Sequence, residues 1–263
     1  MLPPLSIRGK IAAGEVAFWV PLTIMTLVLT VRYGFRKDAG WLFLFLFSLT
    51  RIAAGALMIA IDLVSSPAMK PDMFIAEITL FSAGLALLFL SAIGFLSLAG
   101  QHQYSEYRSM SRSFRGYAIV PIIALGLSIA GDLLGTHVNP EAHIGLILRR
   151  VAAGVYGGAY LLLVILAGKC WTYQYYIKRH RRRLLAGVTF GLLFLGTRVA
   201  YGILDAWSAS DQFGASLSPN PALAQFNSIN GNYITYLVMG LVMEFATATT
   251  LLLSSTVIMR RHY

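Results

Sequence analysis

Two arginines lie inside apolar stretches that are long enough to cross a membrane. Arg51 belongs to the segment Thr50-Arg-Ile-Ala-Ala-Gly55, and Arg198 belongs to the closely similar segment Thr197-Arg-Val-Ala-Tyr-Gly202. A helix would place Arg198, Gly202 and Asp205 on one face, because they are spaced four and three residues apart. A charge inside hydrocarbon costs free energy and usually marks a function or a partner. The two arginines therefore predict either a functional site or a buried ion pair.

Glu77 and Glu244 also lie within apolar stretches, and they allow two interpretations. The glutamates and arginines could pair across helices and satisfy one another structurally. Alternatively, a carboxylic acid that is held away from water can keep its proton and donate it to a substrate. Both interpretations are open from the sequence alone. We predict Glu77 and Glu244 as candidate catalytic acids.

The same predicted zone contains aromatic side chains and polar groups that could hold a substrate. Aromatic faces stabilise cations, including a carbocation that forms during a reaction. Alternatively, the aromatic residues belong to the core or to the interfacial belt of a membrane protein. The predicted substrate-binding residues are Arg51, Arg198, Asp205, Tyr156, Tyr160, Tyr201 and Trp207.

Composition identifies the class of protein and excludes several kinds of site. Hydrophobic residues make up 57% of the 263 residues and charged residues only 12%, whereas a soluble domain carries about 25% charged residues. The chain is therefore an integral membrane protein. The single cysteine, Cys170, excludes an internal disulfide, and the five histidines lie in or beside predicted loops. We expect no metal, no cofactor and no nucleic-acid partner; the partners that we expect are a lipophilic small molecule and membrane lipids, and the oligomeric state is not determined by the sequence.

Seven apolar runs are each long enough to cross about 30 Å of hydrocarbon as a helix. We predict an all-α bundle of seven transmembrane helices that forms a single membrane domain over residues 1–263. The expected helices span roughly 12–33, 41–64, 73–99, 116–135, 149–171, 184–208 and 233–257.

Basic residues in the loops and at the ends of the apolar runs predict the orientation of the bundle. Fourteen of them lie in the first, third and fifth loops and at the C-terminus, against five on the opposite side. Cytosolic loops are enriched in lysine and arginine, so we expect a cytosolic C-terminus and an N-terminus outside the cell or in a lumen. The basic run Lys178–Arg183 would then contact anionic lipid headgroups. We expect a multi-pass protein of the endoplasmic reticulum or another secretory-pathway membrane.

Short similarities between the two halves indicate a parallel repeat of three helices, one linking helix and three helices. The second and sixth runs share the Thr-Arg motif, and the third and seventh each contain one glutamate, Glu77 and Glu244. With the predicted orientation, most acidic residues lie in the outer half of the bundle. The last outer loop, 209–232, is long enough to act as a lid over a cavity there, although it could also be an ordinary polar connection.

The motifs Thr50–Gly55, Thr197–Gly202, Asn227–Gly231 and Met243-Glu244 resemble those of a family of fungal seven-helix membrane proteins described as a domain of unknown function. The resemblance covers almost the whole chain and implies the seven-helix fold. In length and helix number the chain is also similar to the integral membrane terpene cyclases of fungal meroterpenoid biosynthesis. Those enzymes use embedded carboxylic acids to protonate an epoxide or alkene of a prenylated substrate, but their motifs do not map onto individual residues here.

We therefore expect a membrane-embedded terpene cyclase of secondary metabolism, in which a buried acid initiates cyclisation of a prenylated substrate. Its protonation chemistry would require an acid, aromatic walls and the exclusion of water. Two alternatives share the topology: a seven-transmembrane receptor or sensor, and a transporter of lipids or small molecules. A substrate-dependent product would separate the enzyme from both alternatives.

Overall fold

The computed structural model describes residues 6–34, 39–63, 70–100, 108–134, 141–172, 175, 179–208 and 218–259. The helices that form the bundle are α1 (Ile7–Leu29), η1 (Thr30–Gly34), α2 (Ala39–Leu63), α3 (Lys70–Gly100), α4 (Arg108–Leu134), α5 (Glu141–Thr172) and α6 (Arg179–Ser208). They are followed by α7 (Pro221–Ala224), α8 (Tyr233–Thr235), η3 (Tyr236–Val242) and α9 (Met243–Met259).

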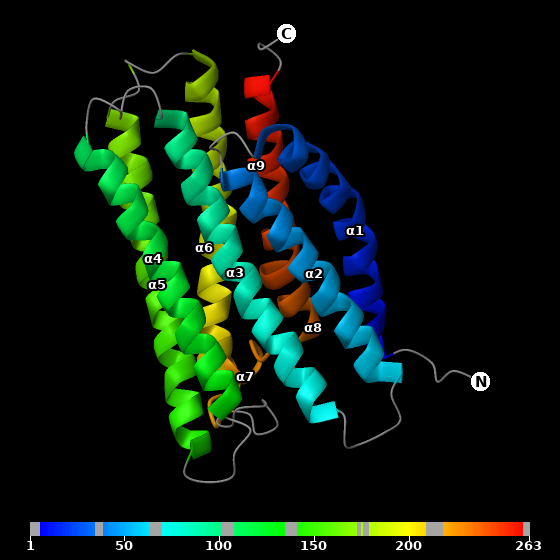
Figure 1. Ribbon diagram of the computed structural model, residues 1–263. Helices are drawn as coiled ribbons and strands as arrows, with labels where there is room; N and C mark the ends of the chain where they lie inside the picture. The colour runs from blue at the N-terminus through cyan, green and yellow to red at the C-terminus, as the bar shows by residue number, and fades with distance from the viewer. Residues whose placement is uncertain are drawn as a thin grey trace.

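Seven of these segments are long and apolar enough to cross a membrane, which confirms the predicted seven-helix bundle. Successive membrane-spanning segments run in opposite directions. In Figure 1, α1 begins at the lower end of the bundle and α9 ends at the upper end. The lower end is therefore where α1, α3 and α5 begin and where α2, α4 and α6 end. The fold is that of a polytopic all-α membrane protein.

Some helices extend beyond the apolar runs that predicted them. Helix α4 begins at Arg108 and α5 begins at Glu141, in each case eight residues before the predicted start. Hydropathy marks only the part of a helix suited to hydrocarbon, whereas backbone hydrogen bonding can continue into polar sequence. The seventh segment also differs from a simple helix, because α8 and α9 are joined through the π-helix η3.

Helix α3 has a central place in the bundle, since it contacts α2, α4, α5, α6 and α9. Helix α1 packs along α2, and α6 packs against α5 and α9. Aromatic rings connect the first and last segments: the Trp19 ring lies edge-on to Phe245 of α9, with 5.6 Å between centroids, and edge-on to Phe47 of α2. The N-terminal and C-terminal helices are thereby held against the same core.

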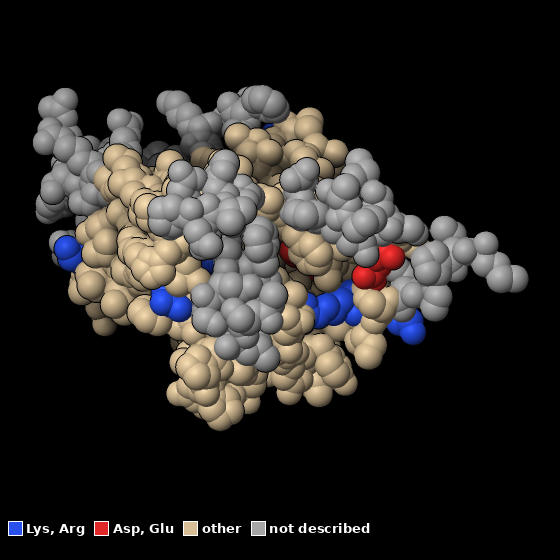
Figure 2. All heavy atoms as spheres, turned by 90° about the horizontal axis from the view of Figure 1, so that it is seen from below, with Lys and Arg blue, Asp and Glu red and all other residues tan. Residues whose placement is uncertain are grey.

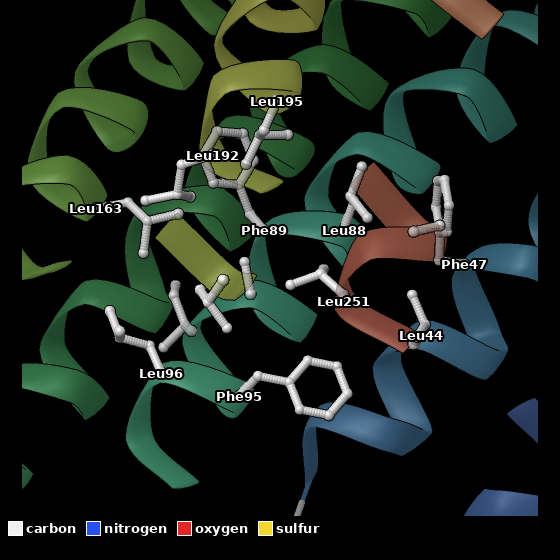
Figure 3. Packing of buried hydrophobic residues seen from close by; sticks show 14 of the residues in the cluster. Leu44, Phe47, Leu88, Phe89, Phe95, Leu96, Leu163, Leu192, Leu195 and Leu251 are labelled. Carbon is white, nitrogen blue, oxygen red and sulfur yellow. The ribbon is translucent and has the colours of Figure 1, made fainter. Parts of the chain in front are cut away.

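A continuous apolar core joins α1 to α6 and α9. Figure 3 shows leucine and phenylalanine side chains from α2, α3, α5, α6 and α9 interdigitating, among them Leu44, Phe89, Leu163, Leu192 and Leu251. Each of these side chains is buried.

Candidate functional site

A cavity occupies the lower half of the bundle and has about 1190 Å³ of empty space, open solvent included. Its walls come from α1 to α6 and from the beginning of η3. Seen from the lower end in Figure 2, acidic and basic side chains lie next to each other among uncharged residues. The charged residues that line the cavity are Arg8, Glu15, Arg51, Glu77, Arg149, Arg198 and Asp205.

Arg51, Arg198 and Glu244 form a buried cluster of three charges, here called the triad. Arg51 donates a hydrogen bond from Nη2, and Arg198 donates one from Nε, to the same oxygen, Glu244 Oε1. The donor–acceptor distance is 2.5 Å in each. All three side chains are at most 2% exposed. The triad joins α2, α6 and α9, so the two predicted Thr-Arg motifs meet at one carboxylate.

The Phe81 ring lies against both guanidinium groups of the triad. Arg51 Cζ is 4.3 Å and Arg198 Cζ is 4.4 Å from the ring centroid, which is well within the range of a cation–π contact. The Tyr236 ring stacks on the Phe81 ring, with 6.4 Å between the ring centroids. Phe81 therefore fixes the two guanidinium groups from α3.

Two glycines provide the space that the arginine side chains occupy. A Cβ atom at Gly84 would lie 3.2 Å from both Nε and Nη2 of Arg51, and one at Gly202 would lie 3.2 Å from Nη1 of Arg198. These distances are tighter than ordinary van der Waals contacts. The absence of a side chain at Gly84 and Gly202 therefore lets the guanidinium groups lie close to α3 and α6.

Asp205 attaches a polar segment of the chain to the cavity rim. Its Oδ2 accepts a hydrogen bond from Arg149 Nη2 at 2.9 Å, and its Oδ1 accepts one from the backbone N–H of Ser228 at 2.8 Å. The turn that follows is held by Asn227, whose Oδ1 accepts from the N–H groups of Ile229 and Asn230. Ser228 and Ile229 line the cavity. Of the predicted lid 209–232, residues 209–217 lie outside the described part of the chain.

Two further carboxylates line the cavity without joining the triad. Among the described residues, no hydrogen bond is seen for the Glu77 carboxylate, and Glu15 Oε1 is buried without a partner. Both carboxylates interact electrostatically with Arg51 over a longer range. Glu77 lies one helical turn before Phe81 and so sits nearer the lower end than the triad does.

A protein-family model described as "Domain of unknown function (DUF7702)" matches residues 5–260. The chain belongs to this family. No match was found among curated proteins. The matched region includes the whole triad and every residue that lines the cavity. The Asn227–Gly231 motif has a structural explanation, because a Cβ atom at Gly231 would overlap the carbonyl oxygen of Asn227.

The structure brings together most of the predicted polar residues but separates the predicted aromatic ones. Arg51, Arg198, Asp205, Glu77 and Tyr156 line the cavity, and Glu244 lies behind the two arginines. The catalytic roles of Glu77 and Glu244 stay predictions.

Three predicted aromatic residues are not among those that line the cavity. Tyr160 packs between helices and donates its hydroxyl to the carbonyl of Leu192 at 3.2 Å. Trp207 is 50% exposed, and Arg150 Cζ lies over its ring, 4.8 Å from the ring centroid. Tyr201 is 1% exposed and lies beside Arg198. Helical spacing alone does not distinguish a cavity-facing ring from one that packs against a neighbouring helix.

Several residues that line the cavity could not be identified as site residues from their position in the sequence. Arg8 and Arg149 lie at the ends of apolar runs, where an arginine normally reaches the membrane surface, yet both face the cavity. Phe81 and Tyr236 also line the cavity, although neither is among the predicted substrate-binding residues. Within the described ranges, no group of three or more His, Cys, Asp or Glu side chains could hold a metal ion.

Proposed function

We propose that the protein is a membrane-embedded cyclase of the terpene type, in which Glu77 protonates a lipophilic prenylated substrate. The observation that carries the proposal is the position of Glu77: its carboxyl group lines the cavity, and no hydrogen bond to it is seen among the described residues. A proton donor must be available to the substrate and not committed to a structural partner.

Glu77 suits this role better than Glu244. Glu244 Oε1 already accepts two charge-assisted hydrogen bonds, and the side chain lies behind Arg51 and Arg198. It therefore serves as the counter-ion of the arginines. Glu77 has no such commitment and faces the same space as Tyr236, whose ring can stabilise positive charge.

The proposed reaction balances without any added cofactor. Glu77 transfers a proton to an epoxide oxygen, whose C–O bond opens, or to a terminal alkene carbon, whose π bond breaks. The π electrons of a neighbouring alkene then form the new carbon–carbon bond to the electron-poor carbon. The resulting cation loses a proton from an adjacent carbon to the carboxylate that remains on Glu77. The product is an isomer of the substrate, and the apolar core beside the cavity helps to exclude water from the cation.

A microsome assay tests the proposal. Microsomes from cells that express the wild type or Glu77→Gln would receive prenylated phenols, prenylated carboxylic acids and the terminal epoxides of both, with products followed by mass spectrometry. We expect an isomeric cyclic product whose rate falls about 100-fold or more in Glu77→Gln, because loss of a general acid typically costs that much.

Asp62→Asn is the matched control, because Asp62 is an α2 carboxylate that bonds Ser6 rather than lining the cavity. It should leave product formation unchanged. Equal rates in Glu77→Gln and the wild type would exclude Glu77 as the acid. No product from any substrate, with folded protein present, would argue against cyclase activity.

A second candidate function, ligand sensing, is favoured by the way the triad joins α2, α6 and α9 beside the cavity. A ligand that competes with Glu244 for the arginines would loosen contacts between three helices at once. In a sensor, a ligand would bind without conversion and change the hydrogen exchange of α9. A labelled ligand recovered unchanged, together with altered exchange, would favour this candidate over the cyclase.

We also propose that the lower end faces a lumen or the cell exterior and that the membrane is that of the endoplasmic reticulum. The excess of basic residues in the loops at the upper end supports this orientation. Several residues behind that prediction, including Arg36, Lys37, Lys178, Arg260 and Arg261, lie outside the described part of the chain.

A further inference from the structure

The guanidinium group of Arg51 is only partly used by the protein. Arg51 is 0% exposed and lines the cavity, yet its Nε and Nη1 atoms have no hydrogen-bond partner among the described residues. Only Nη2 is engaged, by Glu244 and weakly by the carbonyl of Phe81 at 3.5 Å. Buried donors without partners cost free energy, so this unfilled part of Arg51 is a candidate site for an oxygen atom from a ligand.

The charge of the triad indicates which kind of oxygen atom would fit. Two arginines and one glutamate leave a formal charge of +1 in a region that is almost inaccessible to water. Glu15 and Glu77 line the same cavity, but within the described residues neither forms an ion pair with Arg51. One additional negative charge would neutralise the triad, whereas a doubly charged phosphate would leave excess negative charge buried, which is unfavourable.

The surroundings of Arg51 fix its position beside the cavity. Phe81 lies against the face of the guanidinium group, and Gly84 leaves the neighbouring part of α3 without a side chain. The cavity connects this site with the lower end, where Arg8 and Arg149 also line its walls. Cations along an approach path attract anionic ligands.

We propose that the unfilled Nη1 donor of Arg51 binds the carboxylate head group of a lipophilic substrate. This inference rests on the proposed function and narrows its substrate class to prenylated or other long-chain carboxylic acids. The head group occupies the deep end of the cavity beside the triad. The apolar chain extends along Phe81 toward Glu77, which lies one turn nearer the lower end.

Photolabelling with a matched pair of probes tests the site. The purified protein in lipid nanodiscs would be exposed to a long-chain fatty acid that carries a diazirine near its carboxylate, or to the methyl ester of the same probe. Labelled peptides would then be mapped and quantified by mass spectrometry. We expect the acid to label α2 and α3 near Arg51 and Gly84 about tenfold more than the ester does, because a hydrogen bond to a charged group contributes at least that factor.

Two glycine-to-alanine substitutions, each of which adds one methyl group, provide a test variant and its matched control. Gly84→Ala places a Cβ atom against Nε and Nη2 of Arg51 and should reduce labelling by the acid about tenfold, because the methyl group obstructs the ligand's approach. Gly126→Ala on α4 adds the same group where nothing lies within 4 Å and should leave labelling unchanged. Arg51→Lys retains the positive charge beside Glu244 but removes the Nη1 donor, so it should also lose the preference for the acid.

Equal labelling by acid and ester, or labelling by the acid that survives both Gly84→Ala and Arg51→Lys in folded protein, would overturn the proposal. Thermal unfolding of each variant shows whether it is folded. The readout is binding rather than turnover, so it can fail independently of the cyclase. Acid-specific labelling without any cyclised product would support the carboxylate site and would contradict the proposed cyclase activity.

Discussion

Glu244 is the residue on which the positions of Arg51 and Arg198 depend. One carboxylate oxygen accepts a hydrogen bond from each arginine, while its second oxygen, Oε2, has no partner among the described residues. Removing one member of a buried ion pair leaves an uncompensated charge, which is far more costly than losing an exposed pair. At this position, two charges would lose their acceptor together.

We expect Glu244→Gln to destabilise the protein by about 3–5 kcal/mol, because an amide cannot neutralise either guanidinium group. Denaturant titration in mixed micelles would measure the free energy of unfolding. Asp62→Asn is the control, since its hydrogen bonds with Ser6 are exposed. A similar small loss for both variants would show that the triad contributes little to stability.

The sequence indicated the components of the triad but not how they pair. A buried arginine requires a partner, so pairing with a glutamate could be predicted from the position of Arg51 and Arg198 in apolar runs. Glu77 and Glu244 occupy equivalent places in the predicted repeat, and hydropathy does not separate them. The choice depends on how each helix is rotated, and in the seventh segment the π-helix η3 changes that rotation just before Glu244.

At the scale of helices, small residues decide how closely α5 and α6 approach. A Cβ atom at Gly196 would overlap the ring and hydroxyl of Tyr160, which lies across this glycine from α5. Such close packing through small residues is common between membrane helices. It also explains why Tyr160 packs between helices, where its hydroxyl bonds the Leu192 carbonyl. That place in the packing could not be inferred from sequence spacing.

We expect Gly196→Ala to destabilise the protein by about 1–3 kcal/mol, because the added methyl group overpacks the α5–α6 interface. In a Tyr160→Leu background the same substitution should cost much less, since the clashing ring is gone. Unfolding of the two single variants and the double variant forms the cycle, with Gly168→Ala as a control in open space. Additive effects would contradict the contact.

The segment before the seventh helix is held to α6 by Asp205. In Asp205→Ala, the N–H of Ser228 loses its acceptor, and we expect its amide hydrogen to exchange about tenfold faster or more. Asp205→Asn keeps an oxygen that can accept this bond and loses only the charge facing Arg149. Hydrogen–deuterium exchange mass spectrometry of peptides around 225–232 would measure the effect. Unchanged exchange in Asp205→Ala would mean that other contacts hold the segment.

For the whole molecule, the number of helices was predictable and the shape of the cavity was not. Each apolar run is long enough to reveal a membrane helix by itself, and all seven were identified. A cavity depends instead on where several helices fail to fill space. Neither Arg8 nor Gly84 has a sequence environment that places it beside Glu15 or Arg51, so these parts of the site required the three-dimensional structure.

The proposed orientation predicts which loops enter the secretory lumen. The natural sequence has no Asn-x-Ser/Thr site, so an inserted acceptor gives an unambiguous signal. We expect glycosylation of a tag inserted between α4 and α5 at the lower end, and none of the same tag inserted between α3 and α4 at the upper end. A gel shift that is removed by endoglycosidase would measure this. The reverse pattern would place the cavity on the cytosolic side.

The triad also has a consequence for biosynthesis. Arg51 and its acceptor Glu244 are 193 residues apart, and Glu244 lies in the last transmembrane segment. During synthesis, α2 and α6 are both made before the ribosome reaches the carboxylate that neutralises their arginines. Assembly of the lower half is therefore completed only when the final helix inserts, so a nascent chain that stops short of Glu244 carries two unmatched intramembrane charges, which are a recognisable signal for cellular quality control.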